Sequence, residues 1–396
     1  MKVFDFINHA SFKCEHSGST LVTDPWYVSN AFGGWYQNPS PLCSNVMDLI
    51  NSDDKTGVVV SHGHDDHLDD WFIQHHLKKK IFFCPKFPTP GLENRLNKNL
   101  GVITKSIGEG ERFGKFIIQQ FVNPDFTHYD AVVTIETPDF LIIHANDNWH
   151  KWPEEMALKI KNVVSRYNIN NVYLLIQFGV ADSFPVNYEN INKLEAKKIL
   201  NDRFQEYLNG TESNMNALGL SQMYYYANQS LFNYKNIDLD GQSMNELAQL
   251  FLKSKKKNYV QLLPGMSVNI GHNVVYPTED KISIFKYCLN ALENFINSAY
   301  EKYTNDKSCI KVRFKLPKDQ VSINDINYIA ESEVWNRIII GELTLESIII
   351  GGAGSVSKPS QNIRDHHMFV SKRAYMAQGM IQKLGLLFFK EFQNES

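Results

Sequence analysis

Short apolar stretches with strand-like spacing dominate the first 150 residues of the chain. The stretches KVFDFIN, SFKCEHSG and STLVTDPW predict a strand, its hairpin partner and a third strand, with a turn at Ser17-Gly18. The stretch TGVVVSHGH predicts a continuous apolar strand that ends in histidines. Further strand-like stretches follow, namely KKKIFFCP, GVITKSIGEGERFG, KFIIQQFV, DAVVTIETP and DFLIIHAND. This part of the chain is therefore predicted to be rich in β-structure.

The hydrophobic period changes at Trp152. The spacing predicts a helix over 153–168, a buried strand over 171–179 and a second helix over 190–208. The inward face of the first helix would carry Met156, Ile160, Val163, Val164 and Tyr167. The inward face of the second would carry Ile191, Leu194, Ile199, Leu200, Phe204 and Leu208. Helices that alternate with strands in this way favour a layered α/β or α+β domain whose helices cover the sheet faces.

The remaining pattern is less regular and then mainly helical. The three consecutive tyrosines at 224–226 are interpreted as packing residues rather than a stacking platform for a ligand. After residue 280, most of the periodicity is helical, and the glycines at 351–354 are expected in a turn. A chain of 396 residues exceeds the roughly 250–300 residues of a single core. We expect a catalytic domain over residues 1–280 and an α-rich extension over 281–396 that packs on it or caps it.

Composition contributes mainly by exclusion. The net charge is −3, from 40 basic and 43 acidic residues, so a nucleic-acid partner is not expected. The N-terminal segment lacks the apolar run of a signal peptide, and no stretch reaches the ~18 apolar residues of a membrane span, which predicts a cytoplasmic protein. The five cysteines are scattered, without a Cys-x-x-Cys pair, and predict neither a disulfide framework nor a cysteine zinc finger.

Candidate chemistry concentrates in the stretch SHGHDDHLDD at residues 61–70. Side chains two positions apart, such as His62 and His64, point to the same side of an extended chain. A turn after His64 would bring Asp66 and His67 back towards the same volume. Imidazole and carboxylate groups suit zinc, iron or manganese, so these four residues are predicted metal ligands. The acidic pair at 69 and 70 is expected to begin the following helix, and Asp65 is interpreted as a bystander.

The His-x-His-x-Asp-His pattern of residues 62–67 resembles the signature of the metallo-β-lactamase fold superfamily. The resemblance implies a four-layer αββα sandwich with its metal site along one edge of the sheets. It also implies that Asp24 supports the metal loop, whereas His128 and Asp147 are further ligands. One metal would be held by His62, His64 and His128, and the other by Asp66, His67 and Asp147. Asp66 and Asp147 would also be catalytic, together with His9, a contact to the substrate or a support for the ligands.

One departure from the family pattern concerns the second metal. The family usually supplies another histidine after the next buried strand, but the stretch IQFGVADSFPVNYENINKLEA contains none. Replacements considered from the sequence are Asp182, Asn187, Tyr188, Glu189, His272, His366 and His367. The second position could also be weaker, differently coordinated or empty.

Several longer stretches narrow the resemblance within the superfamily. NHASFKCEHSGSTLVTDPWY, NAFGGWYQNPSP, NPDFTHYDAVVTIE, HANDNW, SFPVNYE and ESEVWNRIIIGELTLESIIIGG are similar to cytidine monophosphate N-acetylneuraminate hydroxylase-like proteins. The chain lacks the cysteine–histidine pairs of a Rieske cluster, so it cannot supply that electron-transfer module. More distant similarity is to ascorbate-6-phosphate lactonase and N-acyl-phosphatidylethanolamine phospholipase D, which are hydrolases.

The resemblance implies an enzyme, and two chemistries stay open. The favoured one is a hydrolase with one or two divalent metals, most simply zinc, whose metal-bound hydroxide attacks an ester, lactone, amide or phosphodiester. The alternative is an iron-dependent oxygenase, with one or two irons, that needs an external reductase. A scaffold with a degraded site is a third class, against which the intact motif counts.

The expected partner is a small-molecule substrate, and the sequence specifies no oligomeric state. Four aromatic residues beside the motifs could wall a pocket or pack at its rim, namely Trp26, Trp35, Tyr36 and Trp149. The stretch IRDHHMF, with Arg364, is interpreted as a surface loop more readily than as a substrate contact.

Overall fold

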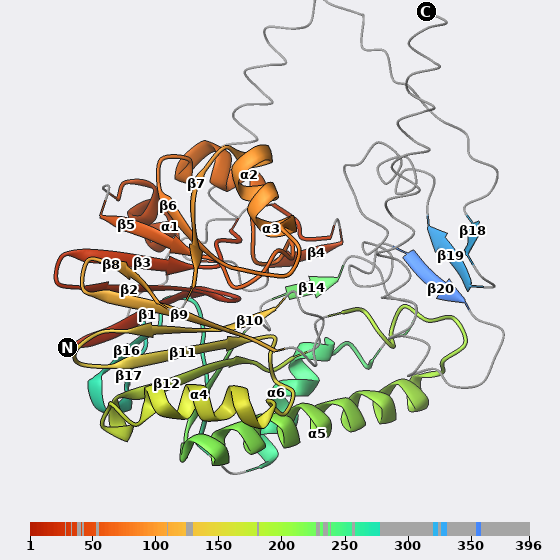
Figure 1. The fold of residues 1–396 in the computed structure, drawn as a ribbon. Coiled ribbons are helices and arrows are strands. Elements are labelled where there is room, and N and C mark those ends of the chain that lie inside the picture. The colour runs from red at the N-terminus through yellow and green to blue at the C-terminus, as the bar shows by residue number, and fades with distance from the viewer. Residues whose placement is uncertain are drawn as a thin grey trace, which may run out of the picture.

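The computed structural model describes residues 1–277, apart from 28, 33, 38–40, 42, 53–54, 109, 124–129, 180–181, 227–229, 233–236, 238 and 256–257, and beyond them 320–323, 326–330 and 354–357. Two large mixed sheets form the centre of the described part. Figure 1 shows them stacked, with one group of helices above and another below.

The first sheet has eight strands and contains the histidine motif at the end of one of them. Its spatial order is β17 (Asn273–Val275), β16 (Ser267–Asn269), β1 (Lys2–Asn8), β2 (Ser11–His16), β3 (Ser19–Thr23), β5 (Thr56–Val59), β6 (Ile81–Pro85) and β7 (Ile103–Ile107). The pairings from β17 to β3 are antiparallel, and those from β3 to β7 are parallel. The hairpin predicted around Ser17-Gly18 is present between β2 and β3.

The second sheet has seven strands and a similar plan. Its order is β15 (Tyr259–Gln261), β13 (Met223–Tyr226), β12 (Val172–Gln177), β11 (Leu141–Asn146), β10 (Ala131–Glu136), β9 (Phe116–Val122) and β8 (Glu111–Phe113). The pairings from β8 to β11 are antiparallel, and those from β11 to β15 are parallel. Both sheets therefore pass from an antiparallel meander to parallel strands, and parallel strands require crossover connections such as the helices seen here.

Alternation along the central strands builds the core between the sheets. On β12, Tyr173 and Leu175 belong to the inter-sheet core, whereas Leu174 and Ile176 face the helices on the outside. Strand β6 behaves the same way in the first sheet, where Phe83 faces the second sheet and Phe82 faces outward. Strands with two buried faces read as continuous apolar runs, which is why the sequence pattern located them.

The outer face of the first sheet is covered by short helical segments. They are α1 (Cys43–Ile50), α2 (Asp70–Phe72), η1 (Ile73–Leu77), α3 (Gly91–Asn94) and η2 (Arg95–Leu100), of which η1 and η2 are π-helical. Their apolar side chains, including Phe72, Leu77 and Leu96, pack with Val58 and Phe82 of the sheet.

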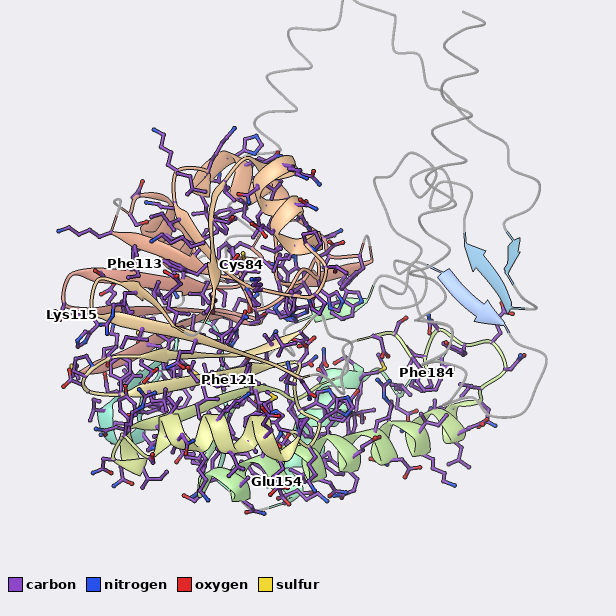
Figure 2. The ribbon with its side chains drawn as sticks, in the orientation of Figure 1. Cys84, Phe113, Lys115, Phe121, Glu154 and Phe184 are labelled. Carbon is purple, nitrogen blue, oxygen red and sulfur yellow. The ribbon has the colours of Figure 1, made fainter. Side chains whose placement is uncertain are left out.

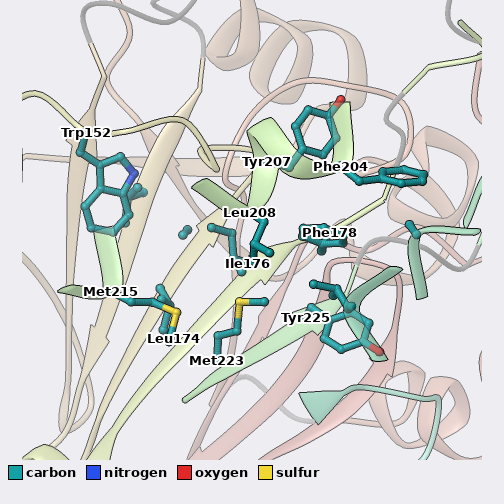
Figure 3. Packing of buried hydrophobic residues seen from close by; sticks show 14 of the residues in the cluster. Trp152, Leu174, Ile176, Phe178, Phe204, Tyr207, Leu208, Met215, Met223 and Tyr225 are labelled. Carbon is teal, nitrogen blue, oxygen red and sulfur yellow. The ribbon is translucent and has the colours of Figure 1, made fainter. Parts of the chain in front are cut away.

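Longer helices cover the outer face of the second sheet (Figure 1). Figure 3 shows buried side chains of this layer, among them Leu174 and Ile176 of β12. They are α4 (Glu154–Val164), α5 (Lys193–Leu218) and α6 (Met244–Ser254). Helix α4 buries Met156, Ile160, Val163 and Val164, as predicted. Helix α5 runs ten residues further than its predicted end at 208. The predicted inward position of Leu194 is wrong, since this side chain is 82% exposed. At 100° per residue, Leu194 lies about 120° around the helix from buried Leu200.

The four layers together confirm the predicted αββα sandwich. Figure 2 shows the side chains between the layers; Phe113 packs against the inter-sheet core and Phe121 against the core beneath the long helices. Smaller elements are β4 (Trp35–Gln37) paired with β14 (Ser230–Phe232), and the 3-10 turns η3 (Ile169–Asn171) and η4 (Ile270–His272). Among the described residues, no helix combines the length and apolar character needed to cross a membrane.

The described residues beyond 280 form a small antiparallel sheet of β18 (Gln320–Ile323), β19 (Ile326–Ala330) and β20 (Gly354–Ser357). The helices expected in this part, and Arg364, His366 and His367, lie outside the described residues. Gly354, expected in a turn, begins β20.

Candidate metal centre

The loop that carries the predicted ligands, residues 60–69, follows β5, and a buried carboxylate stabilises it. Oδ1 of Asp24 accepts a hydrogen bond of 2.8 Å from the Ser61 amide, and Oδ2 accepts one of 2.8 Å from the Ser61 hydroxyl. Asp24 follows β3, the parallel neighbour of β5, so its position is set by the sheet. Its backbone φ of +37° is unusual for a residue with a side chain and marks local strain. The supporting role expected for Asp24 agrees with these contacts.

Arg95 holds the outer side of the same loop. Its Nη1 donates to the Gly63 carbonyl at 2.6 Å, Nη2 to Asp65 Oδ1 at 3.0 Å, and Nε to Asp70 Oδ1 at 3.0 Å. Asp65, interpreted as a bystander, therefore pairs with a cation. Asp69 caps α2 as expected, and its Oδ1 accepts from the Phe72 amide at 3.0 Å. One guanidinium thus ties together the start, middle and end of the loop.

The predicted ligand side chains of this loop converge with Asp147. Nε2 of His62 lies 2.9 Å from Nδ1 of His64 and 3.7 Å from Oδ2 of Asp147. Nε2 of His67 lies 3.6 Å from Oδ2 of Asp66 and 3.9 Å from Oδ1 of Asp147. His62, Asp66, His67 and Asp147 are buried, whereas His64 is exposed. The cluster is therefore open to solvent on the His64 side.

The grouping of these residues differs from the one that the resemblance implies. Ligand atoms of His62, His67 and Asp147 lie within 4.8 Å of one another, as do those of His9, Asp66 and His67. His67 is therefore shared between two groups. His128 lies outside the described residues, so its predicted place beside His62 stays a prediction.

Asp147 comes from the second sheet, in a loop that α5 holds. Asn214 of α5 accepts a hydrogen bond of 2.9 Å from the Trp152 amide and donates one of 2.8 Å to the His150 carbonyl. The Trp152 indole donates to the Asn148 carbonyl at 2.9 Å. A Cβ on Gly210 would lie 2.4 Å from the Trp149 carbonyl oxygen, so only glycine allows the helix to approach this closely.

Two contacts join the loops of the two sheets. Asn146, with a φ of +52°, donates from Nδ2 to the Ser61 hydroxyl at 2.6 Å, and Nδ2 lies 2.9 Å from Nδ1 of His62. Buried His144 places Nε2 2.7 Å from Oδ2 of Asp24 and Nδ1 2.7 Å from the Tyr226 hydroxyl. His144 therefore supports the site from behind. Tyr226, interpreted from the sequence as a packing residue, also makes a polar contact, because its hydroxyl pairs with His144, which in turn contacts Asp24.

The charges of the site shift several pKa values. Burial opposes the charged form of His67, but the carboxylates of Asp66, Asp24 and Asp147 outweigh it and raise the pKa of His67 to about 10. Burial would raise the pKa of Asp66, but His67 and His9 hold it well below its usual value. Burial and the Asp66 carboxylate raise the pKa of Asp147, although His67 opposes this. The site thus holds closely spaced buried charges whose balance depends on what it binds.

Unpaired atoms and their spacing test whether a metal fits. Among the described residues, His9 Nδ1, Asp66 Oδ1, His67 Nε2 and Asp147 Oδ1 are buried without a hydrogen-bond partner. Buried polar atoms are seldom left so, and an ion among them would satisfy several at once. Donors around a tetrahedral zinc at 2.0–2.2 Å are about 3.4 Å apart. The separations of 3.1–3.9 Å among His9, Asp66, His67, His62 and Asp147 agree with that value. The side chains fit a divalent metal.

A third buried carboxylate was missed from the sequence. Oδ1 of Asp130 lies 3.7 Å from Nδ1 of His62, and burial and the Asp147 carboxylate raise the pKa of Asp130. The available signal was a polar residue directly before the buried strand β10, two positions after His128. Arg95 and Asn214 gave no comparable signal.

Two of the replacements considered for the missing late histidine have other partners. The Asp182 carboxylate accepts hydrogen bonds from Nη1 and Nη2 of Arg203, at 3.0 and 2.9 Å, in a buried bidentate ion pair. Nδ1 of His272 lies 2.9 Å from the Tyr224 hydroxyl, and its ring stacks on that tyrosine. Glu189 belongs to neither group of histidine, cysteine, aspartate and glutamate ligand atoms found among the described residues. The backbone amides of Asn187 and Tyr188 donate to the Ser183 and Pro185 carbonyls, each at 3.1 Å.

The aromatic residues beside the motifs mostly pack. Trp26 and Trp35 are buried, and the edge of Trp26 meets the His9 ring with centroids 4.9 Å apart. Trp149 packs on Tyr207 of α5. The ring of Phe32 lies beside exposed His64, with the two ring centroids 5.9 Å apart. The side chain of Tyr36 lies outside the described residues.

The chain is similar to solved structures but matches no family model and no curated sequence. Among solved structures, a "possible metal-dependent hydrolase" from Veillonella parvula matches with 15% identity and a TM-score of 0.42, covering 68% of this chain and 99% of that one. CmlA, a diiron β-hydroxylase from Streptomyces venezuelae, matches with 15% identity and a TM-score of 0.42, covering 70% and 54%.

An isothiocyanate hydrolase from Delia radicum gut bacteria matches with 13% identity and a TM-score of 0.42, covering 68% of this chain and 99% of that one. Each of these three likenesses has a TM-score below 0.5, so function has to be inferred from the chain's own residues.

Proposed function

We propose that this chain is a metal-dependent hydrolase acting on an ester, lactone, amide or phosphodiester. The observation that carries the proposal is the buried convergence of His62, His67 and Asp147, whose ligand atoms lie within 4.8 Å of one another. Of these atoms, His67 Nε2 and Asp147 Oδ1 have no hydrogen-bond partner. His64 and Asp66 adjoin them, and His128 is proposed as a further ligand on the sequence pattern alone.

A bound divalent metal would supply Lewis acidity and lower the pKa of a water molecule towards neutrality. The chain's own residues would orient that water and accept its proton. Asp147 is placed for this, because its Oδ1 is buried in the cluster and has no hydrogen-bond partner. His64, the exposed member of the cluster, faces the side from which a substrate arrives.

Metal content and hydrolysis test this proposal together. Protein purified without chelator is expected to contain zinc, and His64→Ala is expected to lose hydrolysis on a panel of phosphodiesters, lactones and amides. The matched control is His75→Ala, an exposed histidine stacked on Trp71 outside the cluster, which should leave hydrolysis unchanged. Equal hydrolysis by His64→Ala and the wild type would exclude this site as its source.

Removal of the metal should also lower stability. The site gathers the carboxylates of Asp66, Asp130 and Asp147, which repel one another once an ion is removed. Dialysis against a chelator is therefore expected to lower the melting temperature. The loss in the free energy of unfolding should be about 2.7 kcal/mol if the free metal concentration was 100 times the Kd before dialysis. Readdition of zinc should restore it. An unchanged melting transition after complete metal removal would contradict a buried site.

A second candidate is an iron-dependent oxygenase that takes electrons from an external reductase. The observation that favours it is the gathering of three buried carboxylates beside histidines, a ligand set that also suits iron. Metal analysis with an optical spectrum separates the two candidates. Iron with oxygen uptake in the presence of a reductant would support the oxygenase, whereas a colourless zinc protein without oxygen uptake would exclude it.

A further inference from the structure

The N-terminal hairpin places one histidine inside the metal cluster. His9 lies in the turn between β1 and β2, and it is 1% exposed. Its Nε2 lies 3.1 Å from Oδ2 of Asp66, and its ring centroid lies 5.6 Å from that of His67. Trp26 contacts the His9 ring edge-on, which restricts its orientation.

The backbone at His9 is held in a conformation that histidine does not favour. Its φ is +50°, in the left-handed region, and the β1–β2 register shifts between Phe6 and Asn8 just before it. Such a conformation is unfavourable for a residue with a Cβ, and glycine would adopt it without that strain. Strain of this kind is typical of functional sites. A side chain retained there needs a reason.

A hydrogen bond to Asp66 alone does not satisfy the group. It would leave Oδ1 of Asp66, Nε2 of His67 and Nδ1 of His9 buried and without a partner. Ligand atoms of these three residues lie within 4.8 Å of one another. An ion between them would be held by two imidazoles and a carboxylate, a set common for zinc and iron. Because Nε2 of His67 can bind only one ion, the first metal would then be left to His62, His64 and Asp147, whose ligand atoms adjoin.

We propose that His9 is a direct ligand of the second metal, with Asp66 and His67, in the place of the late histidine that the chain lacks. The inference rests on the proposed metal-dependent function. The late loop holds Asp182 in its pair with Arg203, and His272 is engaged by Tyr224. In this proposal the ligand comes from the N-terminal hairpin instead of the loop after β12.

The test uses His9→Gly in the full chain, because glycine accepts a φ of +50° and removes only the imidazole. Metal-free protein is titrated with Zn²⁺ and the bound equivalents are measured by calorimetry and elemental analysis. Wild type should bind two equivalents and His9→Gly one, and free imidazole should restore the second. Ser17→Gly is the matched control, since Ser17 has a φ of +49° in the next turn, at the opposite end of β2 from His9. It should bind two.

The outcomes separate this inference from the proposed function. Two equivalents in His9→Gly, with affinity reduced only about 10–100-fold, would make His9 a support for Asp66 and overturn the inference. One equivalent in the wild type, or loss of both in His9→Gly without rescue by imidazole, would also overturn it. No zinc or iron bound to the wild type would instead remove the proposed function itself.

Discussion

The two loops that meet at the candidate centre are supported by different forces. The loop after β5, from the first sheet, is surrounded by charges: Asp24 lies beneath it and Arg95 crosses its outer side. The loop after β11, from the second sheet, is held by neutral hydrogen bonds to Asn214 and by close packing on Gly210. Both loops deliver predicted ligand side chains to the same volume. The two sheets from which they come share a plan of antiparallel strands followed by parallel ones.

The difference follows from what each loop carries. The first loop presents three histidines and several carboxylates, so its own charges need counter-charges to keep their places. The second loop presents one carboxylate, Asp147, so close packing against α5 and neutral hydrogen bonds are enough to hold its backbone in place. Charge support should depend on ionic strength and on the loss of any one partner, whereas packing support should respond to volume.

The largest effect is expected from removing the charge beneath the first loop. Asp24→Ala deletes the acceptor for Ser61 and for His144, and leaves His67 without its neighbour at 3.3 Å. Loss of one partner from such a buried network should lower the free energy of unfolding by about 3–5 kcal/mol, measured by urea denaturation. Asp139→Ala, at a half-exposed carboxylate near His16, is the control and should cost under about 0.5 kcal/mol. Comparable losses in both variants would refute the role given to Asp24.

A smaller effect is expected from disturbing the packing of the second loop. Gly210→Ala places a methyl group 2.4 Å from the Trp149 carbonyl and forces α5 and the loop apart. Overpacking of this kind should cost about 1–3 kcal/mol of unfolding free energy, and should weaken metal binding through Asp147. Gly91→Ala, where a Cβ meets nothing within 4 Å, should be neutral or slightly stabilising. If both substitutions were neutral, α5 would not set the position of this loop.

The smallest effect is expected at Arg95, and salt should modulate it. Arg95→Gln removes the pairs with Asp65 and Asp70, whose side chains are partly exposed, and the bond to the Gly63 carbonyl. The loss should be about 1–2 kcal/mol at low salt and should shrink at about 1 M salt, where exposed charges are screened within about 3 Å. The cost of Gly210→Ala should stay constant under the same change. Equal salt responses would remove the distinction between the two loops.

Sequence patterns located the elements and the clustered histidines of the first sheet because both are local properties. The apolar runs predict β5 and β12, and the spacing of His62, His64 and His67 is visible within six residues. Supports that act across the fold were not predictable. Arg95 lies 30 positions from Asp65, and Asn214 lies 62 from Trp152, and neither has a neighbourhood that differs from an ordinary helix. Tyr226 reads as packing because its partner, His144, is 82 positions away.

The pairing of β1 with β16 has a consequence for how the protein is made. Phe4 pairs with Val268, and Asp5 and Ser267, which are hydrogen-bonded, are 262 positions apart. At about 5–20 residues per second, the ribosome needs roughly 10–50 s to synthesise the chain between them. During that interval, β1 has β2 as a neighbour but its other edge is open, and the hairpin that carries His9 is not yet held in the finished sheet. A metal bound at the candidate centre would therefore reach its full affinity only after the ribosome has synthesised β16.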